Sequence, residues 1–537
     1  MATRVDPVTV EVVTNALIAF ADEMTLNLAR TAFNTIVYEV RDFCTGLLDA
    51  EARLIAQAPG GLPLFVGDLD APIRDGLALY GTEGFAPGDA IITNHTGTCG
   101  QHLNNMVVYT PVFHRGELVA FPAVRAHWVD VGGRLPGGFL TDAVTSFEEG
   151  IQIRTVKLYR AGEPQEDIFR ILRHNIRQPE NTFGDLRAQI AACRLGERRL
   201  LDLLDRYGRE TVFACIRESW DHAERIVRAE IEKIPDGTYE AESFLDDDGV
   251  DLGRPVPIRV KVTVRGSDLT VDFSGMSPQV RGPINAGPPV GVSAAKLALK
   301  YLAAPEVLIN EGCFRPLRVI LPRGTLISAE EPAAMSWWQT PVLPVIDTIL
   351  KAVGKAVAGR IPAGHYSDIA AILLSGRDGR TGRAYTHIEP LAGGWGARPH
   401  GDGMSATYSI GHGDTYNIPV EVLETRFPIL IERYRLRTDS GGPGRYRGGL
   451  GVERTYRVPY GGRLNALSER SKCPPWGLED GLSAAPGTIT VQQPRHAKVD
   501  HYQKVTGLPL APGARFSFFS GGGGGYGNPL DRDPERV

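Results

Sequence analysis

The abundance of glycine and proline constrains this chain more than any other feature. They occur 62 and 38 times in 537 residues and are spread along the whole length without a period. The combined share usual in globular proteins is only about 12%. Without a repeat, collagen-like and solenoid folds are not indicated. We therefore expect many turns and tightly bent loops between short strands.

The length implies several domains, because 537 residues are too many for one compact core. The predicted fold class is α+β: a multidomain, β-rich chain with helical segments and no doubly wound sheet. We place an N-terminal α+β domain carrying the candidate site at 1–184 and a helical segment at 185–235. A central α+β domain follows at 236–395, and a β-rich, glycine-rich domain at 396–537.

Several elements have strong local signals. The apolar periodicity predicts a helix over Pro7–Thr31, with Asp6 as its N-cap and proline at the first helical position. A hairpin is expected over 43–58, and strands alternate with loops over 89–131. Two helices are predicted at 185–207 and 210–234, with Gly208 between them. A hairpin at 258–273, helices at 290–303 and 342–359, and β-structure over the last 140 residues complete the pattern.

Composition excludes several classes of partner. The net charge of −5 leaves no electrostatic footprint for nucleic acid or an anionic membrane. No run of about eighteen apolar residues predicts a membrane span, and the first residues lack the pattern of a signal peptide. The six cysteines have no zinc-finger spacing, so reduced thiols are expected. We predict a cytoplasmic protein.

Two short segments contain the residues with the clearest chemistry. The first, "TCGQHLNNMVV", contains His102 with Asn105 three residues later; the second, "RAHWVDVGG", contains His127 with Asp130 three residues later. A divalent cation needs three or four converging nitrogen and oxygen donors. Asp42 and His95 are further donors upstream. The spacing alone fits a second interpretation equally well, in which both are ordinary histidines at strand ends that form hydrogen bonds with backbone groups. This second arrangement is the more frequent one.

Three other motifs have both an ordinary and a functional interpretation. The acidic run "DDDGVD" at 246–251 lacks the ligand spacing of a calcium loop and is interpreted as a solvated turn. Arg398 in "GGWGARPHGDG" offers charge for a carboxylate or phosphate of a substrate, or pairs with an internal Asp. Cys99 is a candidate thiolate, although a small buried loop residue is favoured.

The sequence contains no nucleotide-binding motif. We find no Walker A loop and no dinucleotide fingerprint, and the five glycines near residue 523 lack the flanking strand and helix of a phosphate loop. Any chemistry that needs ATP therefore requires another chain.

Several segments along almost the whole chain occur in a distinctive order: "DPVTVEVVTNAL", "RDFCTGLLDAEARLIAQ", "PGDAIITN", "HLNNMVVYTPVF", "RAHWVDVGG", "EEGIQIRTVKLYRAGE", "VDFSGMSPQVRGPINA", "GGWGARPHGDG" and "DSGGPGRYRGGLGVER". Taken together they resemble the B subunits of the hydantoinase/5-oxoprolinase family, which are related to caprolactamase B subunits and to acetone and acetophenone carboxylase subunits. A series of matches in the same order is far more specific than any single motif.

The resemblance implies an enzyme subunit that acts in a hetero-oligomer with a separate, hydantoinase A-like subunit that binds ATP. Family members hydrolyse cyclic amides or, in related complexes, carboxylate ketones. The B-type subunit is expected to hold a divalent metal such as Zn, Mn or Fe. Carried onto this chain, the ligands are His102, Asn105, His127 and Asp130, with Asp42 as a further ligand. His102, His127 and Asp130 are then the candidate catalytic residues.

Two positions depart from the family pattern. Asn105 stands where the family usually has Asp, so one ligand would bind through a neutral carbonyl oxygen. Trp128 stands where a second histidine is frequent and, with Arg398, is a candidate for substrate binding. We expect the metal to be retained. An ATP-dependent cyclic-amide hydrolase is the leading hypothesis, a ketone carboxylase subunit is the second, and a non-catalytic scaffold is the third.

Overall fold

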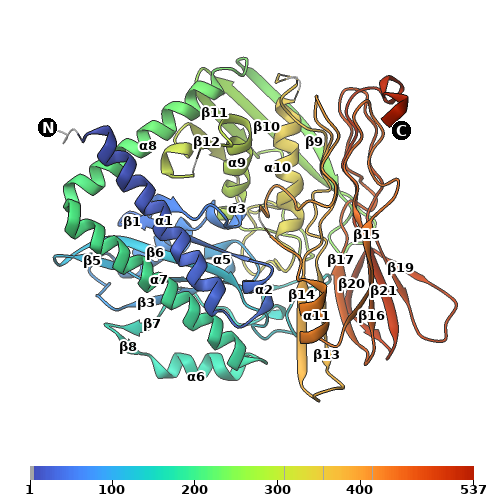
Figure 1. Cartoon of the computed structure of the whole chain (residues 1–537), viewed down its shortest axis with the longest axis horizontal. Helices are drawn as coiled ribbons and strands as arrows, with labels where there is room; N and C mark the ends of the chain where they lie inside the picture. Colours follow the sequence, from blue (N-terminus) through green and yellow to red (C-terminus); the bar gives the residue numbers. More distant parts are fainter. Residues whose placement is uncertain (1–4, 308, 355, 358, 414, 537) are drawn as a thin grey trace.

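The computed structural model describes residues 5–307, 309–354, 356–357, 359–413 and 415–536. Helices and an antiparallel sheet from the first half of the chain lie at one side of the molecule, and long strands from the last third lie at the other (Figure 1). The predicted α+β class, β-rich with helical segments, is confirmed.

The N-terminal sheet contains eight strands in the order β2-β1-β6-β4-β3-β7-β8, with β5 also paired to β6. Each of these pairs is antiparallel. The bounds are β1 Phe43–Asp49, β2 Leu54–Gln57, β3 Ala90–Thr93, β4 Asn105–Tyr109, β5 Val112–His114, β6 Glu117–His127, β7 Val156–Arg160 and β8 Glu163–Pro164. The longest, β6, therefore lies between β1 and β4 at the centre of the sheet.

Two long helices cover this sheet. Helix α1 (Pro7–Thr31) begins at Asp6, whose side chain accepts a hydrogen bond from the Thr9 backbone N–H at 3.0 Å, so the predicted cap and bounds are confirmed. Helix α7 (Pro179–Tyr207) packs against α1, β4 and β6, and α8 (Arg209–Ile231) follows it directly. Gly208 separates the two helices with a φ of 80°, a conformation that favours glycine.

The shorter helices of this half are α2 Thr35–Tyr38, α3 Pro63–Val66, α4 Asp70–Tyr80, α5 Thr96–Cys99 and α6 Glu166–Asn175. Short 3₁₀ helices occur at Ser146–Glu148, Glu311–Phe314, Pro529–Asp531 and Pro534–Arg536.

The second sheet has the order β12-β11-β10-β9. Its strands are β9 Gly237–Leu245, β10 Val256–Arg265, β11 Asp268–Asp272 and β12 Leu317–Ile320, and the predicted β10–β11 hairpin is confirmed. Helix α10 (Gln339–Val353) packs on β9 and β10, and α9 (Pro288–Ala303) packs on α10 (Figure 1).

Two further sheets form the C-terminal part. One has the order β14-β13-β17-β20 and the other β15-β16-β21-β18-β19. The bounds are β13 Ile372–Arg377, β14 Ala384–Glu389, β15 Leu430–Leu436, β16 Val452–Val458, β17 Gly462–Leu467, β18 Thr488–Gln492, β19 Asp500–Tyr502, β20 Lys504–Leu510 and β21 Ala514–Phe519, with helix α11 at Val420–Arg426. The first of these sheets takes strands from both sides of residue 395, the position of a predicted domain boundary.

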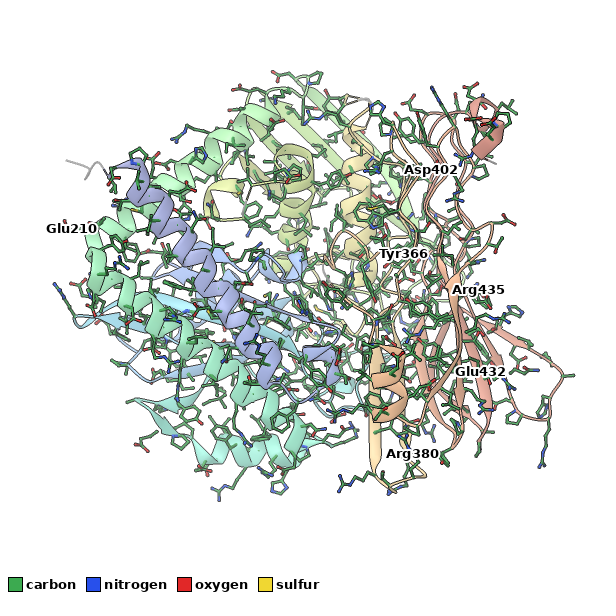
Figure 2. All side chains as sticks on the ribbon, viewed as in Figure 1. Glu210, Tyr366, Arg380, Asp402, Glu432 and Arg435 are labelled. Carbon is green, nitrogen blue, oxygen red and sulfur yellow. The ribbon has the colours of Figure 1, made fainter. Side chains whose placement is uncertain are left out.

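The five-glycine run lies inside this C-terminal part. Gly521 to Gly525 are buried and exchange backbone hydrogen bonds with loops around Gly364, Gly394, Gly442 and Gly449. A Cβ on Gly523 would lie 1.9 Å from the carbonyl oxygen of Trp395. The run is therefore glycine because neighbouring backbones approach too closely for a side chain. Just beyond it, Arg532 pairs at 2.8 Å with Asp402. Figure 2 labels Asp402 near the upper end of the C-terminal part.

The acidic run at 246–251 differs from its prediction as a solvated turn. Asp246, Asp247 and Asp248 are only 2–3% exposed. Asp246 accepts backbone hydrogen bonds from residues 471, 472 and 473, and Asp247 pairs with Lys504 at 2.6 Å. The prediction was wrong because these carboxylates bind groups from the C-terminal part, which the local sequence does not reveal. Among the residues that the structure describes, no helix has the length and apolar character needed to cross a membrane.

Candidate metal centre

Three neighbouring strands bring Asp42, His127 and Asn105 into a row at one end of the N-terminal sheet. Asp42 precedes β1, and its backbone carbonyl accepts a hydrogen bond from the His127 N–H at 3.1 Å. Asn105, the first residue of β4, is the cross-strand partner of His127, the last residue of β6. Because the strands are antiparallel, the beginnings of β1 and β4 meet the end of β6.

His102 joins this row from the turn ahead of β4. Its ring lies 5.0 Å from the ring of His127, centroid to centroid, at an interplanar angle of 82°. The Nδ1 atom is 3.1 Å from the backbone carbonyl oxygen of Ser336, which fixes that nitrogen as the N–H donor and leaves Nε2 with a lone pair. Both rings are almost fully buried, at 2% and 1% exposure.

Five buried polar atoms of the cluster have no hydrogen-bond partner among the residues that the structure describes. These atoms are Asp42 Oδ1, His102 Nε2, Asn105 Oδ1, His127 Nδ1 and His127 Nε2. Buried polar atoms are nearly always paired, so several unpaired donors and acceptors in one place call for an explanation such as an ion. Nitrogen and oxygen atoms of this kind are the ligands that zinc, manganese and iron take in proteins.

Burial sets the charge of the cluster. It lowers the pKa of His102 to about 4, against smaller opposing effects of the Ser336 carbonyl and the Asn105 side chain. Burial and the neighbouring His102 lower the pKa of His127 well below its ordinary value. Burial raises the pKa of the Asp42 carboxyl to about 7. Both imidazoles are therefore neutral at pH 7 and keep a lone pair, which is the state that binds a metal.

Aromatic rings from distant segments form one wall of the cluster. Phe139 lies 5.2 Å from the ring of His102 and 5.7 Å from that of His127. Trp338 lies 6.1 Å from His102, and Trp337 lies 5.0 Å from Phe139. The indole N–H groups of both tryptophans are buried without an acceptor. The wall is therefore apolar and carries two unused donors.

Glu149 holds the segment that orients His102. Its Oε1 atom accepts hydrogen bonds from the Met335 N–H, the Ser336 N–H and the Ser336 hydroxyl at 2.7–2.8 Å. Burial raises the pKa of this carboxyl to about 7 despite those three donors. The segment they fix presents the Ser336 carbonyl to His102 and places the two tryptophans beside it.

Asp130 does not have the surroundings predicted for a ligand or a general base. Its carboxylate accepts hydrogen bonds from the backbone N–H groups of Gly132, Gly137 and Arg177 and pairs with the Arg177 guanidinium at 2.9 Å. These contacts use both oxygens. The side chain holds the loop that leads to Phe139, which has a φ of 55°.

The structure does not bring the two predicted substrate-binding residues to the cluster. Trp128 is fully buried, and its indole donates a hydrogen bond to Gln189 of α7 at 2.8 Å. Trp128 therefore packs between the sheet and the helix. Arg398 is exposed in a tight turn closed by a hydrogen bond from its own N–H to Gly401, in the glycine-rich C-terminal part.

Two other candidate residues have ordinary structural surroundings. His95 pairs with Glu331 at 2.5 Å. Cys99 is 1% exposed, and burial raises the pKa of its thiol to about 12, so it is a small buried residue as expected, although it ends the short helix α5 instead of lying in a loop. Over the described residues, no three His, Cys, Asp or Glu side chains are already placed to hold a metal ion. A metal at this cluster would therefore need Asn105 beside the two histidines and Asp42.

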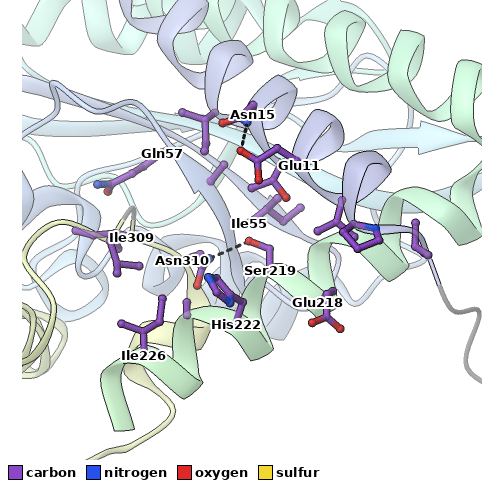
Figure 3. A pocket seen from close by; sticks show the side chains of 18 of the residues that line it. Glu11, Asn15, Ile55, Gln57, Glu218, Ser219, His222, Ile226, Ile309 and Asn310 are labelled. Carbon is purple, nitrogen blue, oxygen red and sulfur yellow. Dashed lines mark hydrogen bonds between the residues drawn. The ribbon is translucent and has the colours of Figure 1, made fainter. Parts of the chain in front are cut away.

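A large cavity lies elsewhere. It has a volume of about 870 Å³ and is lined by residues of the N-terminal half of α1, of strand β2 and of helix α8, and by Glu306, Val307, Ile309 and Asn310 (Figure 3). Glu11, Asn15, Gln57, His222 and Asn310 are among its polar lining residues. None of the predicted site residues lines it, so the histidine cluster remains the candidate centre.

Sequence reasoning missed Phe139, Glu149, Ser336, Trp337 and Trp338. Glu149 lies in "EEGIQIR", one of the segments that carry the family resemblance, and the resemblance was the only signal for it. The other four are loop residues with no motif of their own.

The fold and this cluster define the class of protein. The chain matches the hydantoinase B/oxoprolinase family over residues 6–529, and it belongs to that family. It is 33% identical to a putative D-/L-hydantoinase B subunit of Pseudomonas sp. strain NS671, over 99% of this chain and 92% of that protein. It is 34% identical to the caprolactamase beta subunit of Pseudomonas jessenii, over 98% of this chain and 92% of that protein.

Solved structures agree with this assignment. The ATP-dependent caprolactamase of Pseudomonas jessenii has a TM-score of 0.92 at 32% identity, over 99% of this chain and 93% of that one. An acetone carboxylase in its nucleotide-free form has a TM-score of 0.89 over 99% of this chain and 77% of that one. The identity to the carboxylase is 19%, so that likeness concerns the fold alone.

Proposed function

We propose that this chain is the metal-bearing subunit of an ATP-dependent hydrolase of cyclic amides and that it acts with a separate ATP-binding subunit. The observation that supports this most directly is the group of buried, unpaired donor atoms on Asp42, His102, Asn105 and His127. It occurs in a chain whose relatives over nearly its whole length include a hydantoinase B subunit and a caprolactamase beta subunit.

The residues present fit a divalent cation. His102 and His127 would bind through neutral imidazole nitrogens, Asp42 through its carboxylate and Asn105 through its carbonyl oxygen. The Ser336 carbonyl, held by Glu149, would keep the His102 ring in the tautomer that binds. When bound, such an ion supplies a Lewis acid that polarises a carbonyl and lowers the pKa of water.

The division of labour follows from the chemistry of amides. An unstrained cyclic amide resists hydrolysis because resonance makes its carbonyl carbon a weak electrophile. We place phosphorylation of the amide oxygen on the ATP-binding subunit, because this chain has no nucleotide motif. Hydrolysis of the activated ring is then the task of this chain.

The aromatic wall suits a flat ring as substrate. Phe139, Trp337 and Trp338 give apolar faces next to the histidines, and the unused indole N–H groups are donors for an oxygen of the substrate. The two tryptophans are at most 1% exposed. A substrate therefore reaches the cluster only when an adjacent segment moves aside. Once that segment closes again, it also keeps bulk water away from the cluster.

A stoichiometric assay tests this proposal. The chain is purified with its ATP-binding subunit, and ATP cleavage and ring opening are measured together on hydantoin, 5-oxoproline and caprolactam. His127→Ala is expected to abolish ring opening. The matched control is His114→Ala. It removes a histidine of strand β5 in the same sheet, whose ring pairs with Asp205 of helix α7, and the variant should retain activity. Ring opening at the wild-type rate by His127→Ala would contradict the proposal.

The same assay separates the other two hypotheses. A ketone carboxylase subunit would incorporate labelled bicarbonate into acetone or acetophenone and would leave the cyclic amides intact. A scaffold would bind no stoichiometric metal and would tolerate His127→Ala without change in the activity of the complex.

A further inference from the structure

A buried chain of hydrogen bonds leads from the interior of the sheet to Asn105. Arg125 on β6 pairs with Asp68 Oδ1, and Asp68 Oδ2 accepts a hydrogen bond from Gln101 Nε2 at 2.8 Å. Gln101 Oε1 in turn accepts a hydrogen bond from Asn105 Nδ2 at 2.7 Å. All four side chains are at most 1% exposed.

The first member of this chain fixes the direction of every later bond. A guanidinium only donates hydrogen bonds, and an ionised carboxylate only accepts them. Asp68 therefore requires the amide nitrogen of Gln101, and the amide oxygen of Gln101 must face Asn105. Asn105 then has to donate through Nδ2, which leaves its Oδ1 as the free end of the side chain. That atom is buried and has no hydrogen-bond partner within the described part of the chain.

We propose that Gln101 is a positioning residue that makes Asn105 present its carbonyl oxygen, and not its amide nitrogen, to the cation of the candidate centre. The inference rests on the proposed function, because it assumes that the centre binds a metal. It assigns a role to a residue that touches neither the substrate nor the ion and acts only through Asn105.

The same chain of hydrogen bonds explains why an aspartate does not suit position 105. An Asp there would place a carboxylate oxygen against Gln101 Oε1, where Asn105 Nδ2 now lies at 2.7 Å. Gln101 cannot turn its nitrogen toward position 105 without withdrawing it from Asp68, which is buried and needs that donor. Asp42 is thus left as the carboxylate of the proposed ligand set, and a cation held there would meet one negative charge from that set.

Metal affinity measures this role without relying on catalysis. Zinc dissociation constants are determined for the isolated, metal-stripped chain by competition with a chromophoric chelator. We expect Gln101→Leu to weaken zinc binding about 10- to 100-fold, the usual effect of losing the residue that orients a ligand. Asn105→Leu should weaken binding by at least as much. The double variant should bind no more weakly than Asn105→Leu alone, because Gln101 acts through Asn105.

Gln189→Leu is the matched control. Gln189 is an equally buried amide, bonded to Trp128 and to the Met106 carbonyl between the sheet and α7. Its loss should lower the melting temperature and leave zinc affinity unchanged. If Gln101→Leu binds zinc as tightly as the wild type, or if its effect adds to that of Asn105→Leu, the inference is overturned. Failure of the wild-type chain to bind zinc, manganese or iron stoichiometrically would instead overturn the proposed metal centre itself.

Asn105→Asp provides a second test should Gln101→Leu fold poorly. We expect this variant to melt at a lower temperature than the wild type when stripped of metal, because two acceptors then face each other. An unchanged melting temperature together with tighter zinc binding would contradict the inference.

Discussion

At the scale of single residues, the candidate centre gathers several unpaired donor and acceptor atoms in one place. Oε1 of the buried Glu389 carboxylate, by contrast, accepts hydrogen bonds from Arg454, Asn417 and the Ile418 N–H. Neither ring nitrogen of His127 has a hydrogen-bond partner among the residues that the structure describes. Folding gains nothing from the polarity of the His127 ring, so we attribute that polarity to function.

Replacement of His127 by leucine should therefore separate metal binding from stability. We expect His127→Leu to lose zinc binding and, in the metal-free state, to melt at or slightly above the wild-type temperature, because no hydrogen bond is lost. The measurement is thermal unfolding of stripped protein beside metal analysis. His365→Leu is the contrasting variant: it removes a histidine bonded to Asp347 and Ser367 and should lower the melting temperature. A large loss of stability in His127→Leu would indicate a structural histidine.

The Glu389–Arg454 pair should make stability depend on acid pH. Burial would raise the pKa of the Glu389 carboxyl, but Arg454, His387 and Asn417 hold it at about 2. A carboxyl with a lowered folded-state pKa contributes stability that is complete above its unfolded value of 4.5 and is lost as the pH falls toward 2. Urea unfolding between pH 6 and pH 3 measures this contribution. Glu389→Gln should flatten the pH dependence and cost about 3–5 kcal/mol at pH 6, because Arg454 stays buried without its partner charge.

At the scale of elements, helix bounds and the hairpin were predicted correctly from the sequence where the signal came from residues close together in the chain. The cap and bounds of α1, the Gly208 boundary and the β10–β11 hairpin follow from residues that lie next to each other in the chain. The pairing of His102 and Asn105 with His127 was found through the family resemblance, and the structure explains it by strand register. The aromatic wall and Glu149 were missed because they come from loops that only the folded chain brings together.

Strand geometry also explains why Trp128 packs away from the candidate centre. Successive side chains of an extended segment point to opposite faces, and Trp128, one residue beyond His127, packs toward α7. Asp130 lies beyond the end of β6, after a bend at Val129, and bonds to the loop and to Arg177. A spacing of three suggests a shared face only in a helix or a turn.

Asp130 gives a prediction at this scale. Asp130→Ala removes the acceptor of three backbone N–H groups, so amide exchange at Gly132 and Gly137 should accelerate. Zinc affinity should fall much less than in His127→Leu, because the side chain supports the loop and is not a ligand. Hydrogen exchange and chelator competition measure the two effects. An equal loss of zinc affinity in both variants would restore Asp130 to the ligand set.

At the scale of the whole molecule, buried contacts join segments that are far apart in the sequence. Asp246 and Asp247 bind residues 471–473 and Lys504, and the glycine run at 521–525 lies between loops from residues 364 to 449. Strands β13 and β17 pair across the boundary predicted near residue 395. Such pairing depends on contacts across the whole C-terminal part, which composition and local pattern do not reveal.

Replacing one glycine of the run by alanine, which adds a single methyl group, tests how closely the neighbouring backbones approach it. A Cβ on Gly523 would meet the Trp395 carbonyl oxygen at 1.9 Å, whereas one on Gly401 would meet only Arg398 at 3.8 Å. We expect Gly523→Ala to destabilise the protein by more than the ~1–3 kcal/mol of ordinary overpacking, since the neighbour is backbone. Gly401→Ala should change the midpoint of chemical unfolding little. Equal midpoints for the two variants would contradict the close approach.

The position of this run has a consequence for synthesis in the cell. Residues 521–525 fill space among loops that emerge from the ribosome more than seventy residues earlier. Those loops cannot reach their final arrangement until the run itself has left the ribosome, however early the N-terminal sheet forms. The strands of the last third therefore wait longest for their native neighbours, and during that interval they are the part of the molecule most exposed to wrong pairing.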